Sequence, residues 1–178
     1  MRRAAAIAGM VIALGASGVG AYRLAPPVQE SAHWREIAWP FPRDGWPAGR
    51  AFRCDGACAG AELYVRAKRG FCNCDRGVAD DDEVDRVADI DLIGPRFAAV
   101  APGEEVELGE MRGRARRYDL AMPDGSRTAI GVAVSRRCDL FIAAVQGRGA
   151  ASAMQHAALA FLKTQEMRTW VTAALDGR

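Results

Sequence analysis

Five cysteines are the residues best able to do chemistry in this chain of 178 residues. Four of them lie close together, as a C-x3-C pair followed by a C-x-C pair, and the fifth comes much later. Thiols either join in disulfides or, as thiolates, bind soft metal ions such as copper(I). The spacing therefore predicts either covalent cross-links or a metal site. The five residues are Cys54, Cys58, Cys72, Cys74 and Cys138.

Structural disulfides are the first interpretation of these cysteines. Cys54 and Cys58 flank a Gly-rich turn between two expected strands, so their Cα atoms can come within the limit of about 7 Å that a disulfide requires. Cys72 and Cys74 are too close together in an extended segment to face the same way. We therefore expect one of these two residues to reach Cys138. The odd count leaves at least one thiol free or paired with another chain.

A copper site is the alternative interpretation, with Cys54, Cys58, Cys72, Cys74 and His156 as candidate ligands. The spacing favours copper(I) over zinc, because copper(I) accepts two or three soft ligands. A C-x3-C motif with a distant histidine resembles the copper site of Sco-type copper chaperones. In that family the motif begins a helix of a thioredoxin fold, whereas here it lies between predicted strands. The alternative is thus a periplasmic copper or thiol-redox chaperone, and otherwise no cofactor is expected.

The N-terminus predicts the compartment in which the cysteines react. Arg2 and Arg3 precede an uncharged run over residues 4–21. The arginines favour a cytoplasmic N-terminus, and small residues near the end of the run suit signal-peptidase cleavage. The run is also about long enough to cross the inner membrane. Residues 1–22 are therefore predicted to be a signal peptide or a single-pass anchor, which leaves the rest in the oxidising periplasm, where disulfides persist.

Residues 23–49 form a predicted linker arm that is rich in proline and tryptophan. A flexible tether would be rich in Gly and Ser and would lack aromatic residues. Trp34, Trp39 and Trp46 therefore need a place to pack. The arm could fold back over the core, lie at the membrane interface or dock into a protein partner. The third alternative makes these tryptophans the candidate partner-binding residues.

Residues 50–178 are predicted to form one cysteine-containing α+β domain. Alternating stretches predict strands over residues 50–54, 62–67, 97–100, 114–122, 128–135 and 139–146. Apolar periodicity predicts a short helix over residues 80–88 and a long one from Ser152 to about Leu175. The expected fold is a two-layer sandwich. Its antiparallel sheet, a three-strand meander plus a Cys-containing hairpin, is covered by the long C-terminal helix.

Two charged runs have a structural interpretation. The acidic run from Asp80 to Asp85 lacks the spacing of a calcium loop, so we expect a helix start with solvated carboxylates. Arg112, Arg114 and Arg116 alternate and would form a basic stripe along one strand. Lipid headgroups or an acidic partner could use this stripe, but a solvated outer face is the expected arrangement.

The charge balance and the histidine count exclude other classes of function. Once Arg2 and Arg3 are set aside from the 24 basic residues, the chain carries equal numbers of basic and acidic residues, 22 of each. Nucleic-acid binding needs surplus Lys and Arg, so no such partner is expected. Only two histidines are present, and no G-x-S-x-G motif occurs. The sequence thus predicts a non-enzymatic, periplasmic accessory protein, membrane-anchored or secreted, which binds a protein of the cell envelope.

Overall fold

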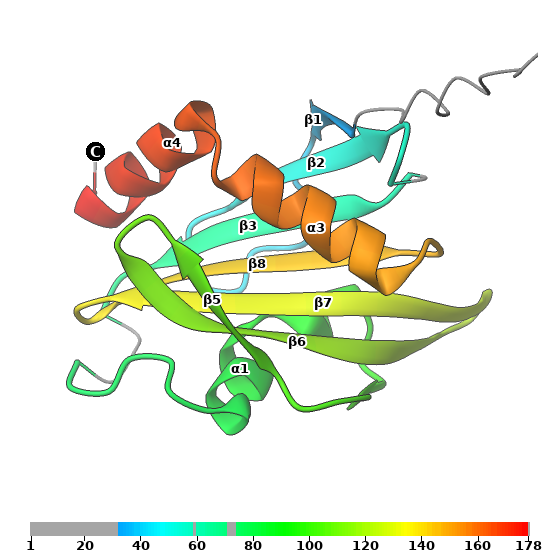
Figure 1. Ribbon diagram of the computed structural model, residues 1–178, viewed down its shortest axis with the longest axis horizontal. Helices are drawn as coiled ribbons and strands as arrows, with labels where there is room; N and C mark the ends of the chain where they lie inside the picture. The colour runs from blue at the N-terminus through cyan, green and yellow to red at the C-terminus, as the bar shows by residue number, and fades with distance from the viewer. Residues whose placement is uncertain (1–31, 59, 71–73, 178) are drawn as a thin grey trace, which may run out of the picture.

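The computed structural model describes residues 32–58, 60–70 and 74–177. These residues form one antiparallel sheet of eight strands and four helices, with helices on both faces of the sheet (Figure 1). The strands are β1 (His33–Ile37), β2 (Arg50–Asp55), β3 (Glu62–Lys68), β4 (Phe97–Ala99), β5 (Glu104–Leu108), β6 (Met111–Met122), β7 (Gly125–Arg136) and β8 (Asp139–Gly147). The helices are α1 (Asp81–Val87), α2 (Ile90–Ile93), α3 (Ala151–Leu162) and α4 (Gln165–Asp176).

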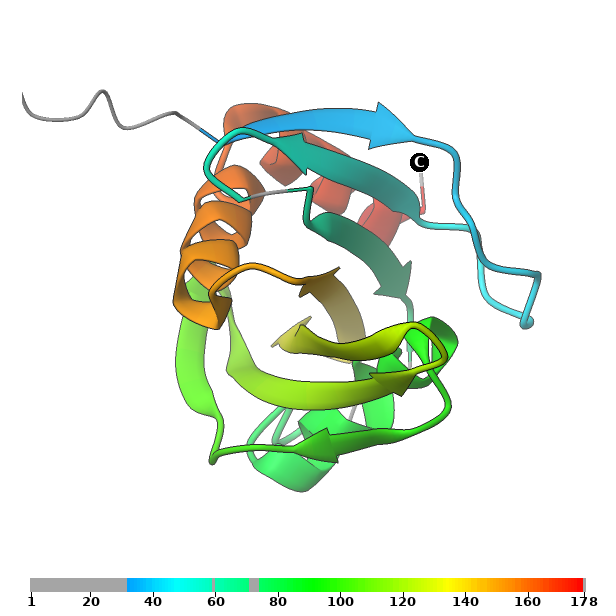
Figure 2. The same cartoon turned by 90° about the vertical axis from the view of Figure 1, so that its right-hand side faces the viewer.

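The strands pair in the order β1-β2-β3-β8-β7-β6-β4. The first part of β6 pairs with β5 and its later part pairs with β4. Strand β8 returns to pair with β3, so the chain between β3 and β6 leaves the sheet to form α1 and α2 before it rejoins at β4. The resulting sheet is strongly curved (Figure 2).

Helices α3 and α4 cover one face of the sheet. Side chains in a strand point alternately to the two faces of the sheet. The large aliphatic residues of β7 point to the face beneath α3 and α4. These residues pack against the buried residues of both helices and form the larger hydrophobic core. Its main members are Ile130, Val132, Val134, Phe141, Ala143, Val145, Met154, Leu162, Met167, Val171 and Leu175.

The opposite face is covered by α1, α2 and the loop between β1 and β2. The residues that β7 presents here are small, namely Ala129, Gly131 and Ala133. A Cβ atom on Gly131 would lie 2.8 Å from the Cβ of Ala88, which directly follows α1. Glycine is therefore needed at position 131, because the chain after α1 approaches the sheet too closely for a side chain.

The predicted two-layer sandwich with one long C-terminal helix is wrong. The stretch from Ser152 to Leu175 forms two helices, which are separated at Lys163 and Thr164. The backbone of Thr164 is extended, and its hydroxyl accepts a hydrogen bond from the amide of Met167, so Thr164 begins a new helix. The apolar periodicity continues across this break and conceals it in the sequence. With both faces of the sheet covered, the fold has three layers.

The sheet contains two strands, β1 and β5, that were not predicted. Strand β1 lies inside the segment that was expected to be a linker. No helix in the part of the chain that the structure describes is both long enough and apolar enough to cross a membrane. The predicted signal or anchor segment, residues 4–21, lies outside the described residues.

Candidate functional site

Two disulfides join four of the five cysteines. Cys54 and Cys58 bridge the turn between β2 and β3, with a Cα–Cα distance of 5.9 Å. Cys74 and Cys138 lie 4.2 Å apart between their Cα atoms, and they tie the chain after β3 to the turn between β7 and β8. The predicted presence of disulfides is confirmed. Cys72 lies outside the described residues.

The candidate copper ligands are not brought together in the described residues. Cys54, Cys58 and Cys74 are held in the two disulfides, and His156 lies on α3. Within the described ranges, no group of three or more His, Cys, Asp or Glu side chains is placed to hold a metal ion.

The linker arm folds back over the sheet after β1. Trp39 packs edge-on against Phe41 and Tyr64, with ring centroids 5.2 Å and 6.2 Å away. Phe41 itself lies 4.7 Å from Tyr64 of β3. The loop lies so close to β3 that a Cβ atom on Gly49 would collide with the carbonyl oxygen of Val65 and with the Trp39 ring. Glycine at position 49 therefore allows the arm to close.

Trp34 lies apart from the other two candidate tryptophans. It belongs to β1 and stacks on Phe161 of α3, with ring centroids 5.6 Å apart. Its indole nitrogen is buried and forms no hydrogen bond within the described residues. Trp34 thus joins β1 to the core beneath α3, whereas Trp39 and Trp46 belong to the loop.

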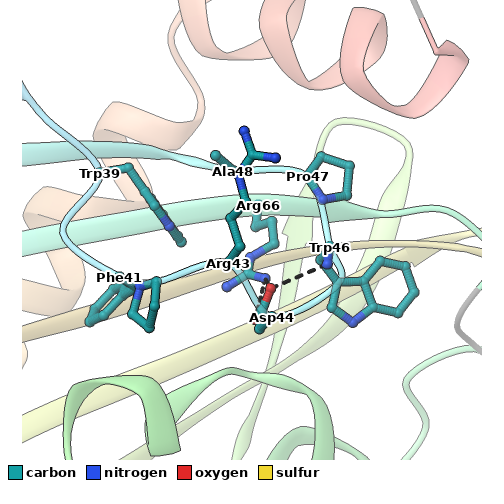
Figure 3. A pocket seen from close by; sticks show the side chains of 9 residues that line it. Trp39, Phe41, Arg43, Asp44, Trp46, Pro47, Ala48 and Arg66 are labelled. Carbon is teal, nitrogen blue, oxygen red and sulfur yellow. Dashed lines mark hydrogen bonds and ion pairs between the residues drawn. The ribbon is translucent and has the colours of Figure 1, made fainter.

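Trp39 and Trp46 line one cavity, which we name the arm pocket (Figure 3). It has a volume of about 270 Å³. Aromatic rings and prolines form its walls, and two ion-paired side chains lie at its base. The lining residues are Trp39, Phe41, Pro42, Arg43, Asp44, Trp46, Pro47, Ala48 and Arg66.

Arg66 of β3 forms the floor of the arm pocket and is only 2% exposed. Its Nη1 donates to both carboxylate oxygens of Asp44, at 2.9 Å and 2.7 Å. The guanidinium carbon also lies 5.1 Å from the centre of the Trp39 ring, close enough for a cation–π contact. Burial alone would raise the pKa of Asp44, but the hydrogen bonds from Arg66 and from the amide of Trp46 lower it. Asp44 therefore stays ionised and holds the loop on the sheet.

A second buried cation lies beside Arg66 on the same face of β3. Lys68 is 4% exposed, and its ammonium donates to the carbonyl of Val87 and to the carboxylate of Asp89. Asp89 also lies 3.2 Å from Nη2 of Arg66. Burial raises the pKa of the Asp89 carboxyl, and the two cations act against this shift. The Lys68 ammonium lies 5.8 Å from the Trp46 ring, so Trp46 covers this ionic cluster from the loop side.

The remaining charged runs of the sequence neutralise each other. Arg114 and Arg116 of β6 pair with Asp81 and Asp85 of α1, at 2.8 Å and 2.7 Å. Tyr118 donates to the same Asp85, and burial together with this hydrogen bond raises the pKa of the phenol. Two arginines of the stripe and the acidic helix start, each expected to be solvated, therefore hold α1 against the sheet, whereas Arg112 is exposed as expected.

Sequence reasoning missed Asp44, Arg66 and the other charged residues of the arm pocket. Arg66 and Lys68 alternate with apolar residues along β3, a pattern that is typical of a solvated strand face. The loop covers them instead, through contacts between residues far apart in sequence. The proline and tryptophan content of residues 23–49 predicted an arm, but it gave no signal for which residues of the sheet the arm would contact.

No protein-family profile matches the chain, and no curated protein is similar to it in sequence. By its fold and its pocket, the described part of the chain is a disulfide-bonded antiparallel sheet domain with helices on both faces and an aromatic pocket.

Proposed function

We propose that this chain is a non-enzymatic accessory protein of the cell envelope, which binds a protein partner through the arm pocket. The N-terminal segment, with two arginines before an uncharged run, supports export. The two disulfides are compatible with an oxidising compartment.

The observation that carries the proposal is the composition of the arm pocket. Trp, Tyr and Arg are the residues that most often dominate binding energy at protein interfaces. The pocket presents the rings of Trp39 and Trp46, and the buried Arg66 guanidinium beneath them holds the loop in place. Its volume of about 270 Å³ lies just below the range of about 300–1,000 Å³ typical of cofactor and drug-sized sites. Such a size fits one or two side chains of a partner.

The rigidity of the pocket also supports a binding role. The hydrogen bonds from Arg66 Nη1 to both carboxylate oxygens of Asp44, and the packing of Trp39 on Tyr64, fix the loop before a partner arrives. A fixed binding surface loses less conformational entropy on association, which leaves more of the interaction energy for affinity.

A photocrosslinking amino acid in the full chain tests the partner interaction in living cells. Placed at position 46, it is expected to give one discrete adduct with an envelope protein, and an added Trp39→Ala substitution removes that adduct. The matched control places the same amino acid at position 112, near the start of β6, where the Arg112 side chain is 84% exposed and does not line the arm pocket. An identical adduct from both positions, or none from position 46, would refute the proposal.

The compartment needs a separate measurement. We expect cell fractionation followed by thiol alkylation and mass spectrometry to find the protein in the envelope with two disulfides. Recovery from the cytosol with all five thiols reduced would contradict the proposed location.

A further inference from the structure

We propose a second binding site between α4 and the β5–β6 hairpin, for an amphipathic small molecule with an acyl chain and an anionic head. The site does not depend on the arm pocket, which lies on the other face of the sheet. Figure 1 shows the β5–β6 turn reaching toward α4 across this face.

The feature that suggests this site is a cavity of about 350 Å³. Its inner wall consists of core side chains from the hairpin, from β8 and from both C-terminal helices. They are Leu108, Met111, Phe141, Leu162, Val171 and Leu175. The cavity is open at the surface, and its inner wall reaches side chains of the larger hydrophobic core.

The size and the lining favour an apolar chain over water. An enclosed cavity of about 150 Å³ lined by aliphatic residues binds benzene. This cavity is open to the surface but more than twice as large, and its inner wall offers no polar side chain. An acyl chain can enter from the surface, because the rim includes the exposed residues Gly109 and Thr172.

Charged side chains at the rim select the head of the ligand. Arg136, Arg168 and Glu110 belong to the lining, so two cations face one carboxylate. Arg136 forms an ion pair with Asp176, with 2.7 Å between Nη2 and the carboxylate oxygen. Arg168 donates to the neutral amide oxygen of Gln165 and has no ion pair with the residues that the structure describes. The positive charge of Arg168 therefore favours an anionic head such as a carboxylate.

Calorimetric titration of the disulfide-intact protein with dodecanoate tests the site. We expect saturable binding of one molecule per chain, and much weaker binding of dodecyltrimethylammonium, which has the same tail and the opposite charge. Trp170 supplies an internal reporter, because its ring lies 6.3 Å from that of Phe141 in the cavity wall. Its fluorescence should change over the same concentration range.

Two substitutions on α4 locate the binding. Thr172→Trp places a large side chain over the opening and is expected to abolish dodecanoate binding. Thr169→Trp adds the same side chain to an exposed position outside the lining, and it should leave binding intact. Equal binding by both variants, or no binding of dodecanoate by the wild type, would overturn the site.

The choice of head group is tested separately. Arg168→Ala should weaken dodecanoate binding by about tenfold, since a charge-assisted contact contributes roughly that factor. The same substitution should leave the affinity for the neutral alcohol dodecanol unchanged. Equal loss for both ligands would show that Arg168 shapes the opening without selecting an anion, and would overturn that part of the proposal.

Discussion

On one face of the sheet, α3 and α4 bury a continuous set of aliphatic and aromatic side chains. On the other face, β7 presents small residues and a smaller hydrophobic core is present. Ion pairs also join this face to the arm, through Arg66 and Asp44, and to α1, through Arg114 and Asp81. Apolar burial is non-directional, whereas ion pairs with fixed geometry favour one arrangement of the groups they join. Both faces bury apolar side chains, but the face beneath α3 and α4 has the larger hydrophobic core. We therefore expect that face to contribute more to stability, and the ion pairs of the other face to fix where the arm and α1 lie.

The largest effect is expected from the apolar face. Phe141→Ala removes a side chain that is 1% exposed at the centre of the larger core. It should lower the free energy of unfolding by about 3–5 kcal/mol, measured by urea denaturation. The matched control, Val100→Ala at an exposed position, should change stability by less than about 0.5 kcal/mol. A small loss for Phe141→Ala would break the assignment of stability to this face.

Asp89→Asn should cost about 3 kcal/mol, because it leaves two buried cations with less compensation. Asparagine tolerates the left-handed backbone of this residue, with φ 56°, so the substitution isolates the charge. Adding Lys68→Met removes one of the stranded cations and should recover part of the loss. If the double variant is as unstable as the sum of the single ones, the cluster is not a coupled unit.

The two ends of the arginine stripe should differ. Arg114→Ala removes contacts to Asp81 and to the carbonyl of Gly103, and should cost about 1.5–3 kcal/mol. Arg112→Ala removes only an exposed pair with Glu107, and should cost less than about 0.5 kcal/mol. Thermal denaturation of both variants gives this comparison. Equal losses would contradict a structural role for the α1 contact.

The smallest expected effect concerns Asp81, which contributes to how the free energy of unfolding depends on pH. The amide of Gly103 and the Arg114 guanidinium lower the pKa of Asp81 below its ordinary value. The folded state therefore binds this proton more weakly than the unfolded state. The contribution of Asp81 is complete above the ordinary pKa of about 3.9 and is lost as the pH falls below that value. Urea titrations at several pH values should show a shallower acid loss for Asp81→Asn. Phe141→Ala should keep the wild-type dependence of stability on pH. The acid loss would then belong to the α1 face alone.

The sequence contained enough information for the local pairings of this fold. The three-strand meander predicted from residues 114–122, 128–135 and 139–146 contains the β6–β7 hairpin, and the spacing of Cys54 and Cys58 predicted their bridge. Both features depend on residues that are close along the chain. The break at Thr164 was missed because apolar periodicity outweighed a single capping residue. The arm pocket could not be predicted, because Asp44 meets Arg66 across 22 positions.

The bond between Cys74 and Cys138 closes a covalent ring that contains α1, α2 and β4 to β7. A protease that cuts once inside this ring, for example near the exposed Val100, leaves both pieces attached to each other. The nicked molecule should therefore migrate as one species until a reductant separates it into two fragments. In a compartment that contains proteases but no strong reductant, the two fragments of a singly cut chain would stay covalently joined.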